Sequence, residues 1–280
     1  MDHYAVVGNP VAHSLSPRIH ELFARACAQD MSYTTLLAPL EDFAGTVSRF
    51  FAEGGAGLNV TVPFKAEAAE WVTEMDAAAR AAGAVNTVVP VAGGYRGHNT
   101  DGAGLIRDIR GNCGEPLARR RVLVLGAGGA ARGALRPLLT EHPLLVTVAN
   151  RTEDRAVDLA ASAAADFPDV PVEGMALAAV RETYDVVINA TSAGLGDGAP
   201  AAAVNPAVVA GAFCYDMIYA APGAAAADTA FCRWARQESA RRVVDGLGML
   251  VEQAALAFRL WRGVEPDTAS VLSQLRRARS

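Results

Sequence analysis

A glycine-rich turn between a strand and a helix is the feature that most constrains how this chain folds. The mostly apolar run over residues 121–125 is typical of a buried strand, and residues 126–131 follow it with the spacing GxGxxA. Leu135, Leu138 and Leu139 then recur at the spacing of a helix. This order of elements predicts a doubly wound α/β fold, in which the glycines let a dinucleotide pyrophosphate approach backbone N–H groups of the helix. A turn with only a structural role is the alternative.

The next predicted strand indicates which cofactor the chain binds. Residues 145–149 form this strand, and Asn150-Arg151-Thr152 follows it, with Arg155 one helical turn after Arg151. An NAD site usually has Asp or Glu here for the ribose hydroxyls, whereas an arginine suits the 2′-phosphate of NADP. We therefore expect NADP. Thr191 follows another predicted strand, residues 185–189, and would lie at the same edge of the sheet.

The chain has a single lysine, Lys65, among its 25 lysine and arginine residues. A compositional bias toward arginine would tend to replace any lysine that serves only as a charge. Lysine can release its proton when burial or neighbouring groups lower its pKa, whereas arginine keeps its proton at any usable pH. Lys65 is therefore a candidate for proton transfer. Chance retention is the alternative, because one residue is a small sample.

The residues before Lys65 place it just past the end of a strand. Apolar and polar side chains alternate over residues 58–62, which predicts one apolar and one polar face, and Pro63 cannot extend the ladder. Ligands of open α/β sheets bind at this end of the strands. Asn59, Thr61 and Lys65 would then line one pocket for a hydroxylated substrate. Without a pocket, Asn59 and Thr61 would simply face solvent.

Two serines precede a predicted helix near the N-terminus. Ser16 followed by Pro17 predicts an N-cap with proline at the first helical position, and residues 19–26 carry an apolar stripe at helical spacing. Ser14 has no such structural role. Two serines at a strand-to-helix turn can also hold a carboxylate or a hydroxyl group. We therefore expect Ser14 to bind substrate, and Ser16 to be a cap, a ligand or both.

Further polar residues occupy places where an apolar or purely structural residue would be ordinary. Asn86 interrupts an apolar run predicted as a strand. Asp101 precedes Gly102 and a helix, where a cap is the simplest role. Gln253 lies on the apolar stripe of a helix predicted over residues 249–261. A buried amide must be hydrogen-bonded, so Gln253 satisfies either backbone groups or a substrate.

Composition argues against several classes of protein. The net charge of −5 and the pI near 5.6 do not suit a nucleic-acid-binding surface. The four cysteines show no CxxC or CxxxH spacing, so we expect reduced cytosolic thiols and no metal site. No segment reaches the ~18 apolar residues of a membrane span, and the N-terminal residues do not read as a signal peptide. We expect a cytoplasmic protein with neither a membrane nor a nucleic acid as its partner.

Several segments, taken in order along the chain, form a specific set. They are Ser14-Leu15-Ser16-Pro17, Asn59-Val60-Thr61-Val62-Pro63-Phe64-Lys65, Gly83-Ala84-Val85-Asn86-Thr87, Asn99-Thr100-Asp101-Gly102, residues 126–130, Asn150-Arg151-Thr152, Asn189-Ala190-Thr191-Ser192 and residues 246–253. Together they resemble the shikimate dehydrogenase family. The resemblance extends over nearly the whole chain, and its specificity lies in the set and its order, since no single motif is decisive.

The resemblance implies an α/β chain of two domains. An N-terminal α/β domain with a mostly parallel sheet, residues 1–103, would bind substrate and be completed by C-terminal helices over residues 246–280. A Rossmann-like NADP-binding domain, residues 104–245, would be inserted between these two parts. A small-molecule substrate is then the expected partner, and a homodimer is left open.

The resemblance also implies a reaction, the reversible NADPH-dependent reduction of 3-dehydroshikimate to shikimate in aromatic amino acid biosynthesis. Lys65 and Asp101 would be the catalytic pair that handles the hydroxyl proton. The residues that would hold the substrate are Ser14, Ser16, Thr61, Lys65, Asn86, Asp101, Tyr219 and Gln253, besides Asn59 from the strand pattern. Those that would bind NADP are Gly126, Ala127, Gly128, Gly129, Ala130, Asn150, Arg151, Thr152, Arg155, Thr191, Met217 and Gly246.

The chain departs from the family pattern in few places. Ser239 stands where the family often has glycine. Ala220-Ala221-Pro222-Gly223 is looser than the usual proline-threonine pattern, which bears on the loop that carries Tyr219. The alanine-rich residues 221–227 are interpreted as a variable loop.

Two alternative functions remain open at this point. A quinate/shikimate dehydrogenase that accepts NAD would share the fold, but Arg151 and Ser16 argue against it. A non-catalytic regulator that binds NADP or a metabolite would share the scaffold, but the intact Lys65 and Asp101 argue against that function.

Overall fold

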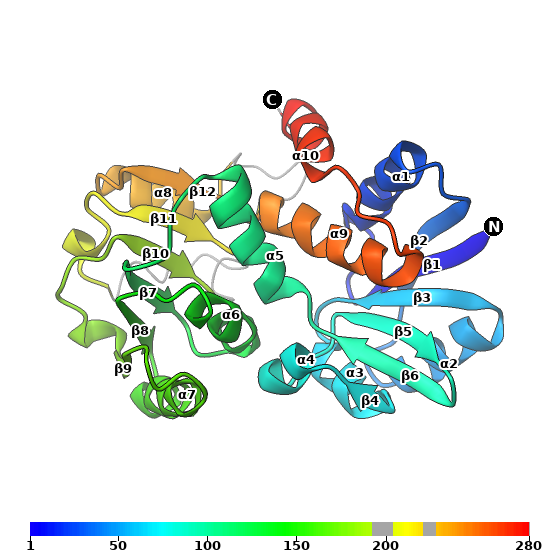
Figure 1. Ribbon diagram of the computed structural model, residues 1–280, viewed down its shortest axis with the longest axis horizontal. Coiled ribbons are helices and arrows are strands. Elements are labelled where there is room, and N and C mark those ends of the chain that lie inside the picture. Colours follow the sequence, from blue (N-terminus) through cyan, green and yellow to red (C-terminus); the bar gives the residue numbers. More distant parts are fainter. Residues whose placement is uncertain (192–203, 221–227, 280) are drawn as a thin grey trace. The chain divides into compact units, whose positions relative to one another are not determined.

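The computed structural model describes residues 1–191, 204–220 and 228–279, which form two compact units (Figure 1). The first unit comprises Met1–Gly104 and Leu250–Ser280, and the second comprises Leu105–Met249. The second unit thus interrupts the first, with boundaries one and four residues from those expected at 103/104 and 245/246. The loop expected at residues 221–227 lies outside the described residues.

The first unit contains a six-stranded mixed sheet with strand order β2-β1-β3-β5-β6-β4. Its strands are β1 (Asp2–Gly8), β2 (Met31–Leu37), β3 (Gly55–Val60), β4 (Glu74–Met75), β5 (Thr87–Val91) and β6 (Gly94–His98). The pairings of β3 with β5 and of β5 with β6 are antiparallel, and the other pairings described are parallel. Its helices include α1 (Ser16–Ala26), α2 (Phe43–Ala52), α3 (Lys65–Trp71), α4 (Ala77–Ala82) and α10 (Thr268–Arg277).

The chain passes between the units within helices. Helix α5 (Asp101–Arg107) leaves the first unit after Gly104, and α9 (Leu247–Arg262) returns to it at Leu250. Within the first unit these helices approach closely, because a Cβ at Gly104 would lie 2.7 Å from the backbone nitrogen of Gln253. A glycine is therefore needed at this crossing. The close approach brings Asp101 and Gln253 into the same region of the unit.

Strand β3 is covered on both faces. Leu58 and Val60 pack into a core with side chains of α2 and α3. On the other face, Gly57 lies against the indole of Trp261 from α9. The predicted alternation is therefore only partly right. Asn59 is 6% exposed and does not face solvent, and Val62 lies beyond the end of the strand with 55% of its surface exposed.

The second unit has a six-stranded parallel sheet with the order β12-β11-β10-β7-β8-β9. Its strands are β7 (Arg121–Leu125), β8 (Leu145–Asn150), β9 (Val172–Ala176), β10 (Val186–Asn189), β11 (Phe213–Asp216) and β12 (Arg242–Val244). Its helices are α6 (Gly129–Leu139), α7 (Glu153–Asp166) and α8 (Ala230–Gln237), with short turns η1 (Asp108–Asn112), η2 (Leu177–Ala179) and η5 (Pro206–Val208). This arrangement confirms the α/β class and the Rossmann-like second domain.

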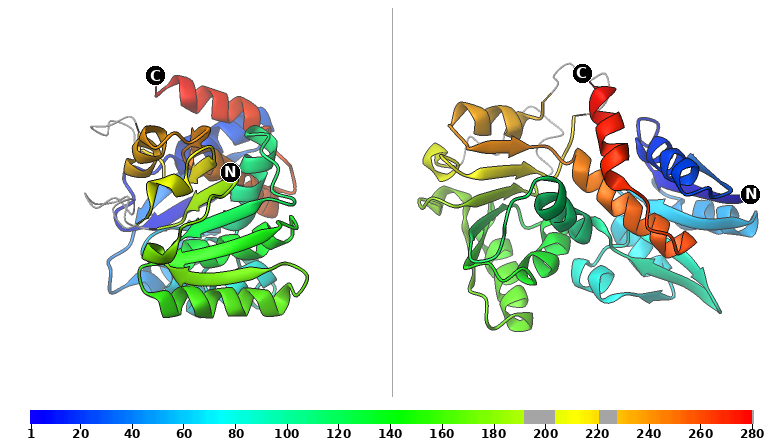
Figure 2. Two further views of the ribbon diagram at one scale, coloured as in Figure 1. Left: turned by 90° about the vertical axis from the view of Figure 1, so that its left-hand side faces the viewer. Right: turned by 45° about the horizontal axis from the view of Figure 1, so that its top comes forward.

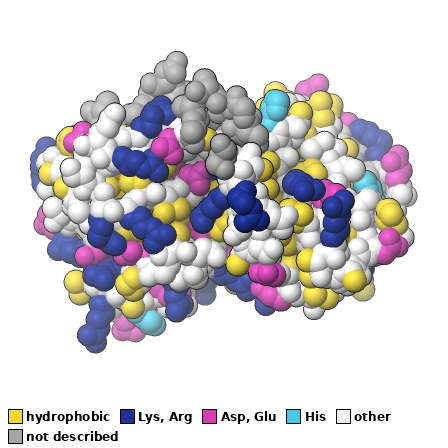
Figure 3. All heavy atoms as spheres, turned by 90° about the horizontal axis from the view of Figure 1, so that it is seen from above, with side chains coloured by type: hydrophobic (Ala, Val, Ile, Leu, Met, Phe, Trp, Pro, Cys, Tyr) yellow, Lys and Arg dark blue, Asp and Glu magenta, His cyan; other side chains and the backbone are white. Residues whose placement is uncertain are grey.

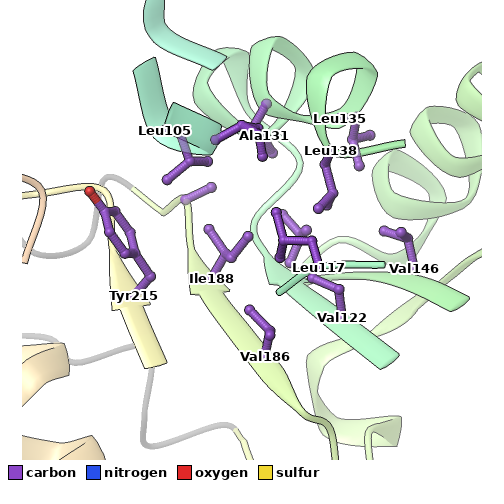
Figure 4. Packing of buried hydrophobic residues seen from close by; sticks show 14 of the residues in the cluster. Leu105, Leu117, Val122, Ala131, Leu135, Leu138, Val146, Val186, Ile188 and Tyr215 are labelled. Atoms are coloured by element: carbon purple, nitrogen blue, oxygen red, sulfur yellow. The ribbon is translucent and has the colours of Figure 1, made fainter. Parts of the chain in front are cut away.

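Apolar cores lie on both faces of the second sheet. Figures 1 and 2 show this sheet and the helices that pack against it. On one face, Leu135 and Leu138 of α6 point toward Val122 and Ile188 of the sheet, as Figure 4 shows. On the other face, α8 contributes Phe231 to a separate core. Strands covered on both sides are typical of parallel sheets, which explains why their sequences are continuous apolar runs.

Charged side chains of both signs mix on the surface. Arginines and carboxylates stand side by side on the face drawn in Figure 3. Several ion pairs form among the described residues, such as Arg18 with Glu21 and Arg96 with Glu74. No helix within the described residues is long and apolar enough to span a membrane.

Candidate active site

Lys65 and Asp101 meet in the first unit as the sequence predicts. Lys65 is the first residue of α3, Asp101 is the first residue of α5, and Nζ lies 2.6 Å from Oδ2. The two side chains are 32% and 17% exposed, so the pair keeps a side open to a ligand. A lysine and a carboxylate that share a hydrogen bond can exchange a proton with a substrate hydroxyl.

Asn86 holds the other oxygen of the Asp101 carboxylate. Its Nδ2 donates to Asp101 Oδ1 at 2.8 Å and to Thr100 Oγ1 at 2.9 Å. Its Oδ1 accepts the backbone N–H of Thr100 at 2.9 Å. Each oxygen of the carboxylate therefore has its own donor, Lys65 on one side and Asn86 on the other, which fixes the plane of the carboxylate.

Gln253 of α9 borders the same cluster. Its Nε2 donates to the Leu250 carbonyl at 2.8 Å, and its Oε1 lies 3.4 Å from both Asn86 Nδ2 and Thr100 Oγ1. The nitrogen therefore satisfies a backbone group, which was one of the two roles expected for it. The oxygen faces the polar cluster. Gln253 is only 9% exposed, so little of its side chain is accessible to a small ligand.

The two serines differ in their surroundings. Helix α1 begins at Ser16 itself, its N-cap is Leu15, and no side chain caps it, so the prediction of a Ser16 cap was wrong. The physical reason is that the Ser16 hydroxyl is engaged elsewhere, by the phenol of Tyr33. The Ser16 N–H donates instead to Ser14 Oγ at 3.2 Å. Ser14 is half-buried, and its own hydroxyl proton is not used in that bond.

Asn59 differs from the pocket-lining residue that we expected. Its Oδ1 accepts the Tyr33 hydroxyl at 2.6 Å, and its Nδ2 donates to the Asn86 carbonyl at 3.1 Å and to Thr87 Oγ1 at 3.0 Å. The amide is thus bonded within the protein. Thr61, which was expected beside it, lies half-buried just past the end of β3. Tyr33 and Thr87 were not predicted as site residues, and the only signal for Thr87 was a hydroxyl in an apolar strand.

A neutral histidine lies beneath Tyr33. The rings of His20 and Tyr33 stack with centroids 4.1 Å apart and planes within 7°. His20 is fully buried, and neither ring nitrogen has a hydrogen-bond partner of good geometry among the described residues. Burial lowers the pKa of His20 to about 3, and the neighbouring Asn59 side chain opposes this only in part. The imidazole is therefore uncharged at neutral pH.

The glycine turn of the second unit has the geometry of a phosphate cradle. Gly126 has a φ of 105°, which favours glycine, and it follows β7 directly. A Cβ built at Gly128 or Gly129 would meet nothing within 4 Å, so packing does not demand these two glycines. They leave room before the free N–H groups that open α6. An anion such as a pyrophosphate fits such a helix start.

Two arginines follow β8, the strand next to β7 in the sheet. Asn150 ends β8, and its Nδ2 donates to the Thr152 carbonyl at 2.9 Å, which shapes the turn into α7. Arg151 and Arg155 are exposed, and neither pairs with a carboxylate within the described part of the chain. Free guanidinium groups at the carboxyl edge of a parallel sheet can bind a phosphate in a bidentate manner.

A buried polar cluster supports the remaining cofactor residues. Thr191 Oγ1 donates to Asn189 Oδ1 at 2.8 Å, and Asn189 Nδ2 donates to Asp216 Oδ1 at 2.9 Å. Thr229 Oγ1 donates to Asp216 Oδ2 at 2.5 Å. Burial raises the pKa of Asp216, and the hydrogen bond from Thr229 is the largest opposing effect. Asp216 was not predicted as a site residue, because an aspartate where a strand ends and a turn begins is common.

The loops after β11 and β12 carry the other expected residues. The N–H of Met217 donates to the Asn189 carbonyl at 3.0 Å, and the N–H of Gly246 donates to the Ile218 carbonyl at 3.0 Å. Met217 and Gly246 therefore lie together at the carboxyl edge of the second sheet. Tyr219 is partly buried and also belongs to the second unit, whereas the other residues expected to hold substrate belong to the first.

Known protein families match the chain over most of its length. Residues 6–88 match the shikimate dehydrogenase substrate binding domain, and residues 110–195 match the shikimate / quinate 5-dehydrogenase family. Residues 246–276 match the shikimate 5'-dehydrogenase C-terminal domain. The three matches follow the order of the two units along the chain.

Individual proteins are similar over nearly their full length. A relative from Aromatoleum aromaticum, named shikimate dehydrogenase (NADP(+)), is 52% identical over 279 residues, which are 99% of this chain and 98% of that protein. The structure of an Ael1 enzyme from Pseudomonas putida has 42% identity and a TM-score of 0.89, with 98% of each chain covered. Shikimate 5-dehydrogenase from Thermus thermophilus, solved in complex with NADP(H) and shikimate, has 34% identity and a TM-score of 0.81, with 99% and 100% covered.

Proposed function

The chain belongs to the shikimate dehydrogenase family, and we propose that Lys65 and Asp101 move the hydroxyl proton in its reversible, NADP-dependent reduction of 3-dehydroshikimate to shikimate. The single observation that carries this proposal is the 2.6 Å contact between Lys65 Nζ and Asp101 Oδ2. In the direction of reduction, Lys65 gives its proton to the carbonyl oxygen of the substrate. In the reverse direction it takes the proton back, while Asp101 holds the ammonium in place and shares its proton.

We assign the cofactor to the second unit. The cofactor, when bound, would supply the hydride for reduction as NADPH and accept it for oxidation as NADP⁺. The turn over residues 126–130 would hold its pyrophosphate, and Arg151 and Arg155 would hold its 2′-phosphate. The open space at the glycines supports this assignment, as do the two guanidinium groups, which pair with no carboxylate of the described residues. Thr191, Met217 and Gly246 would border the rest of the cofactor.

We assign the substrate to the first unit. Ser14 and Ser16 would hold its carboxylate, and Asn86 with Thr61 and Gln253 would hold its hydroxyl groups. Tyr219 would contribute from the second unit. The hydrogen bond from Asn86 to the Asp101 carboxylate, which also contacts Lys65, supports this assignment, because it places the Asn86 amide beside the catalytic pair. The role of Asn59 is to support Asn86, not to touch the substrate.

The test replaces Lys65 and measures NADPH absorbance with shikimate as the substrate. Lys65→Arg keeps the charge but has no usable neutral form, so it should fail nearly as badly as Lys65→Ala. Both should lose roughly 100-fold or more in kcat, while the KM for shikimate changes little. Arg96→Lys is the matched control, because Arg96 pairs with Glu74 at 2.7 Å in the same unit, away from the pair.

The result that would end the assignment is a Lys65→Arg enzyme with near-normal kcat. The base would then be Asp101 or a bound water. Titration of NADP into each variant, followed by fluorescence, separates a loss of chemistry from a loss of cofactor binding.

The cytoplasmic location stays a prediction, and the homodimer stays an open question for this protein. Fractionation of the producing cells decides the first, and sedimentation velocity on the purified chain decides the second.

A further inference from the structure

A chain of hydrogen bonds, buried in its middle links and part-buried at its two ends, leads from Tyr33 to the catalytic pair. The proposed mechanism does not use most of it. Tyr33 OH meets Asn59 Oδ1 at 2.6 Å, and Asn59 Nδ2 meets Thr87 Oγ1 at 3.0 Å. Thr87 Oγ1 lies 3.0 Å from Asn86 Oδ1, and Asn86 Nδ2 lies 2.8 Å from Asp101 Oδ1. Asn59, Asn86 and Thr87 are all buried. These hydrogen bonds lead from β2, past the intervening β1, to β3 and then to the first residue of β5.

Backbone groups fix the orientation of both amides in this chain. Asn59 places one nitrogen proton on the Asn86 carbonyl, which can only accept, so its Nδ2 faces β5 and its Oδ1 faces Tyr33. Asn86 receives the backbone N–H of Thr100 on its Oδ1, so its Nδ2 must face Asp101. Neither amide can turn over without breaking a buried bond to the backbone.

The amides in turn fix the protons of the two hydroxyls. Thr87 accepts from Asn59, so its own proton points to Asn86 Oδ1. Burial raises the pKa of Tyr33 well above its usual range, and the Ser16 hydroxyl bonded to it opposes this only in part, so the phenol keeps its proton. That proton points to Asn59 Oδ1. Every donor therefore points the same way, toward the carboxylate of Asp101.

We propose that Tyr33 and Thr87 are positioning residues for catalysis, which act through Asn59 and Asn86 to hold the Asp101 carboxylate against Lys65. Hydrogen bonds that point in one direction polarise each other, and a buried chain of them resists rotation at every link. The Tyr33 hydroxyl therefore affects the position of the Asp101 carboxylate through these hydrogen bonds, although Tyr33 contacts neither member of the catalytic pair. This inference rests on the proposed roles of Lys65 and Asp101.

The first test removes one hydroxyl at a time. Thr87→Val and Tyr33→Phe keep the shape of each side chain, and each should lower kcat for shikimate oxidation by about threefold to tenfold, the value of one hydrogen bond. The KM for NADP should stay unchanged. Thr87→Ser restores the hydroxyl and should recover kcat to within about twofold of the wild type. Thermal unfolding of each variant shows whether the protein is folded.

A double variant tests whether the links form one chain. Thr87→Val interrupts the series of hydrogen bonds between Tyr33 and Asp101. Adding Tyr33→Phe to Thr87→Val should therefore cause little additional loss of kcat. Tyr4→Phe is the matched control, because Tyr4 is a buried tyrosine on the neighbouring strand whose hydroxyl bonds Arg262 at 3.3 Å. It removes a hydrogen bond of the same unit outside the chain and should leave kcat unchanged.

A second readout does not depend on activity. The amide proton of Thr100 donates to Asn86 Oδ1, so its NMR shift should move in Thr87→Val and stay in Tyr4→Phe. If the wild type fails to oxidise shikimate, the proposed function is at fault, and this shift still decides whether the chain exists. The inference is overturned if Thr87→Val keeps the kcat of the wild type, if Thr87→Ser loses as much as Thr87→Val, if the two losses multiply in the double variant, or if the Thr100 signal does not move.

Discussion

The buried imidazole of His20 should make the first unit lose stability as the pH falls below neutral. Its pKa is about 3 in the folded protein against an ordinary value of 6.5. Between these values the unfolded chain takes up a proton that the folded protein does not, so unfolding is favoured as the pH falls through 6.5. The perturbation that isolates this effect is His20→Phe. It keeps an aromatic ring among Phe23, Tyr33 and Trp261 and removes the group that titrates.

The magnitude follows from the distance between the two pKa values. Each pH unit below 6.5 costs about 1.4 kcal/mol in the free energy of unfolding, so His20 alone should remove about 2 kcal/mol between about pH 7 and about pH 5. The effect would grow until the pH approaches the pKa of the folded state. It is a large part of the stability of an ordinary domain.

The assay is urea unfolding of the wild type and of His20→Phe at both pH values, in a Trp234→Phe background. The remaining tryptophans, Trp71 and Trp261, both lie in the first unit, so their fluorescence reports that unit. The wild type should lose about 2 kcal/mol more than the variant on going to about pH 5. His13→Gln is the control, because it removes an exposed histidine of the same unit.

The reasoning fails if His20→Phe keeps the pH slope of the wild type. Such a result would mean that the ring accepts a proton within the folded protein, by finding a partner or by opening to water. A change in packing cannot imitate the expected outcome, because it shifts the stability at both pH values by the same amount.

Further predictions concern the cofactor, the substrate and one strained turn. Arg151→Ala should weaken the binding of NADP by roughly tenfold to hundredfold, the value of a charge-assisted hydrogen bond, and leave the binding of NAD nearly unchanged. Equal use of both cofactors by the wild type would contradict this prediction. Shikimate should have a much higher kcat/KM than quinate, because quinate adds a hydroxyl beside the carboxylate grip of Ser14 and Ser16, and comparable values would favour a broader specificity. Ser239→Gly should raise stability by about 1 kcal/mol, since Ser239 has a φ of 64°, and an unchanged Tm would show that the serine is not strained there.

Local patterns predicted the elements that one stretch of chain determines by itself. The turn from β7 into α6 was readable because glycines, an apolar strand and a helical stripe occur within one short segment. Lys65 was readable because its type is unique in the chain. In both cases neighbouring residues carry the whole signal, and no distant contact is needed to interpret it.

Contacts between distant segments account for what the sequence did not reveal. The alternation around Asn59 predicted a polar side that lines a pocket, but α9 and Tyr33 cover that side from elsewhere in the chain. The Ser16 cap failed for the same reason, because Tyr33 engages the hydroxyl. The path from Tyr33 to Thr87 depends on the order of strands in the sheet, which no single segment encodes.

The interrupted first unit also bears on the order in which the protein is made. Domains generally fold during synthesis in order along the chain, with the N-terminal one first. Here the ribosome completes the second unit at Met249, before the residues that finish the first unit exist. Gln253, which crosses Gly104, and Trp261, whose Nε1 donates to the Val88 carbonyl at 3.1 Å, are added last. A nascent chain therefore contains all residues of the second unit at a stage when α9, which covers one face of β3 in the first unit, is not yet complete.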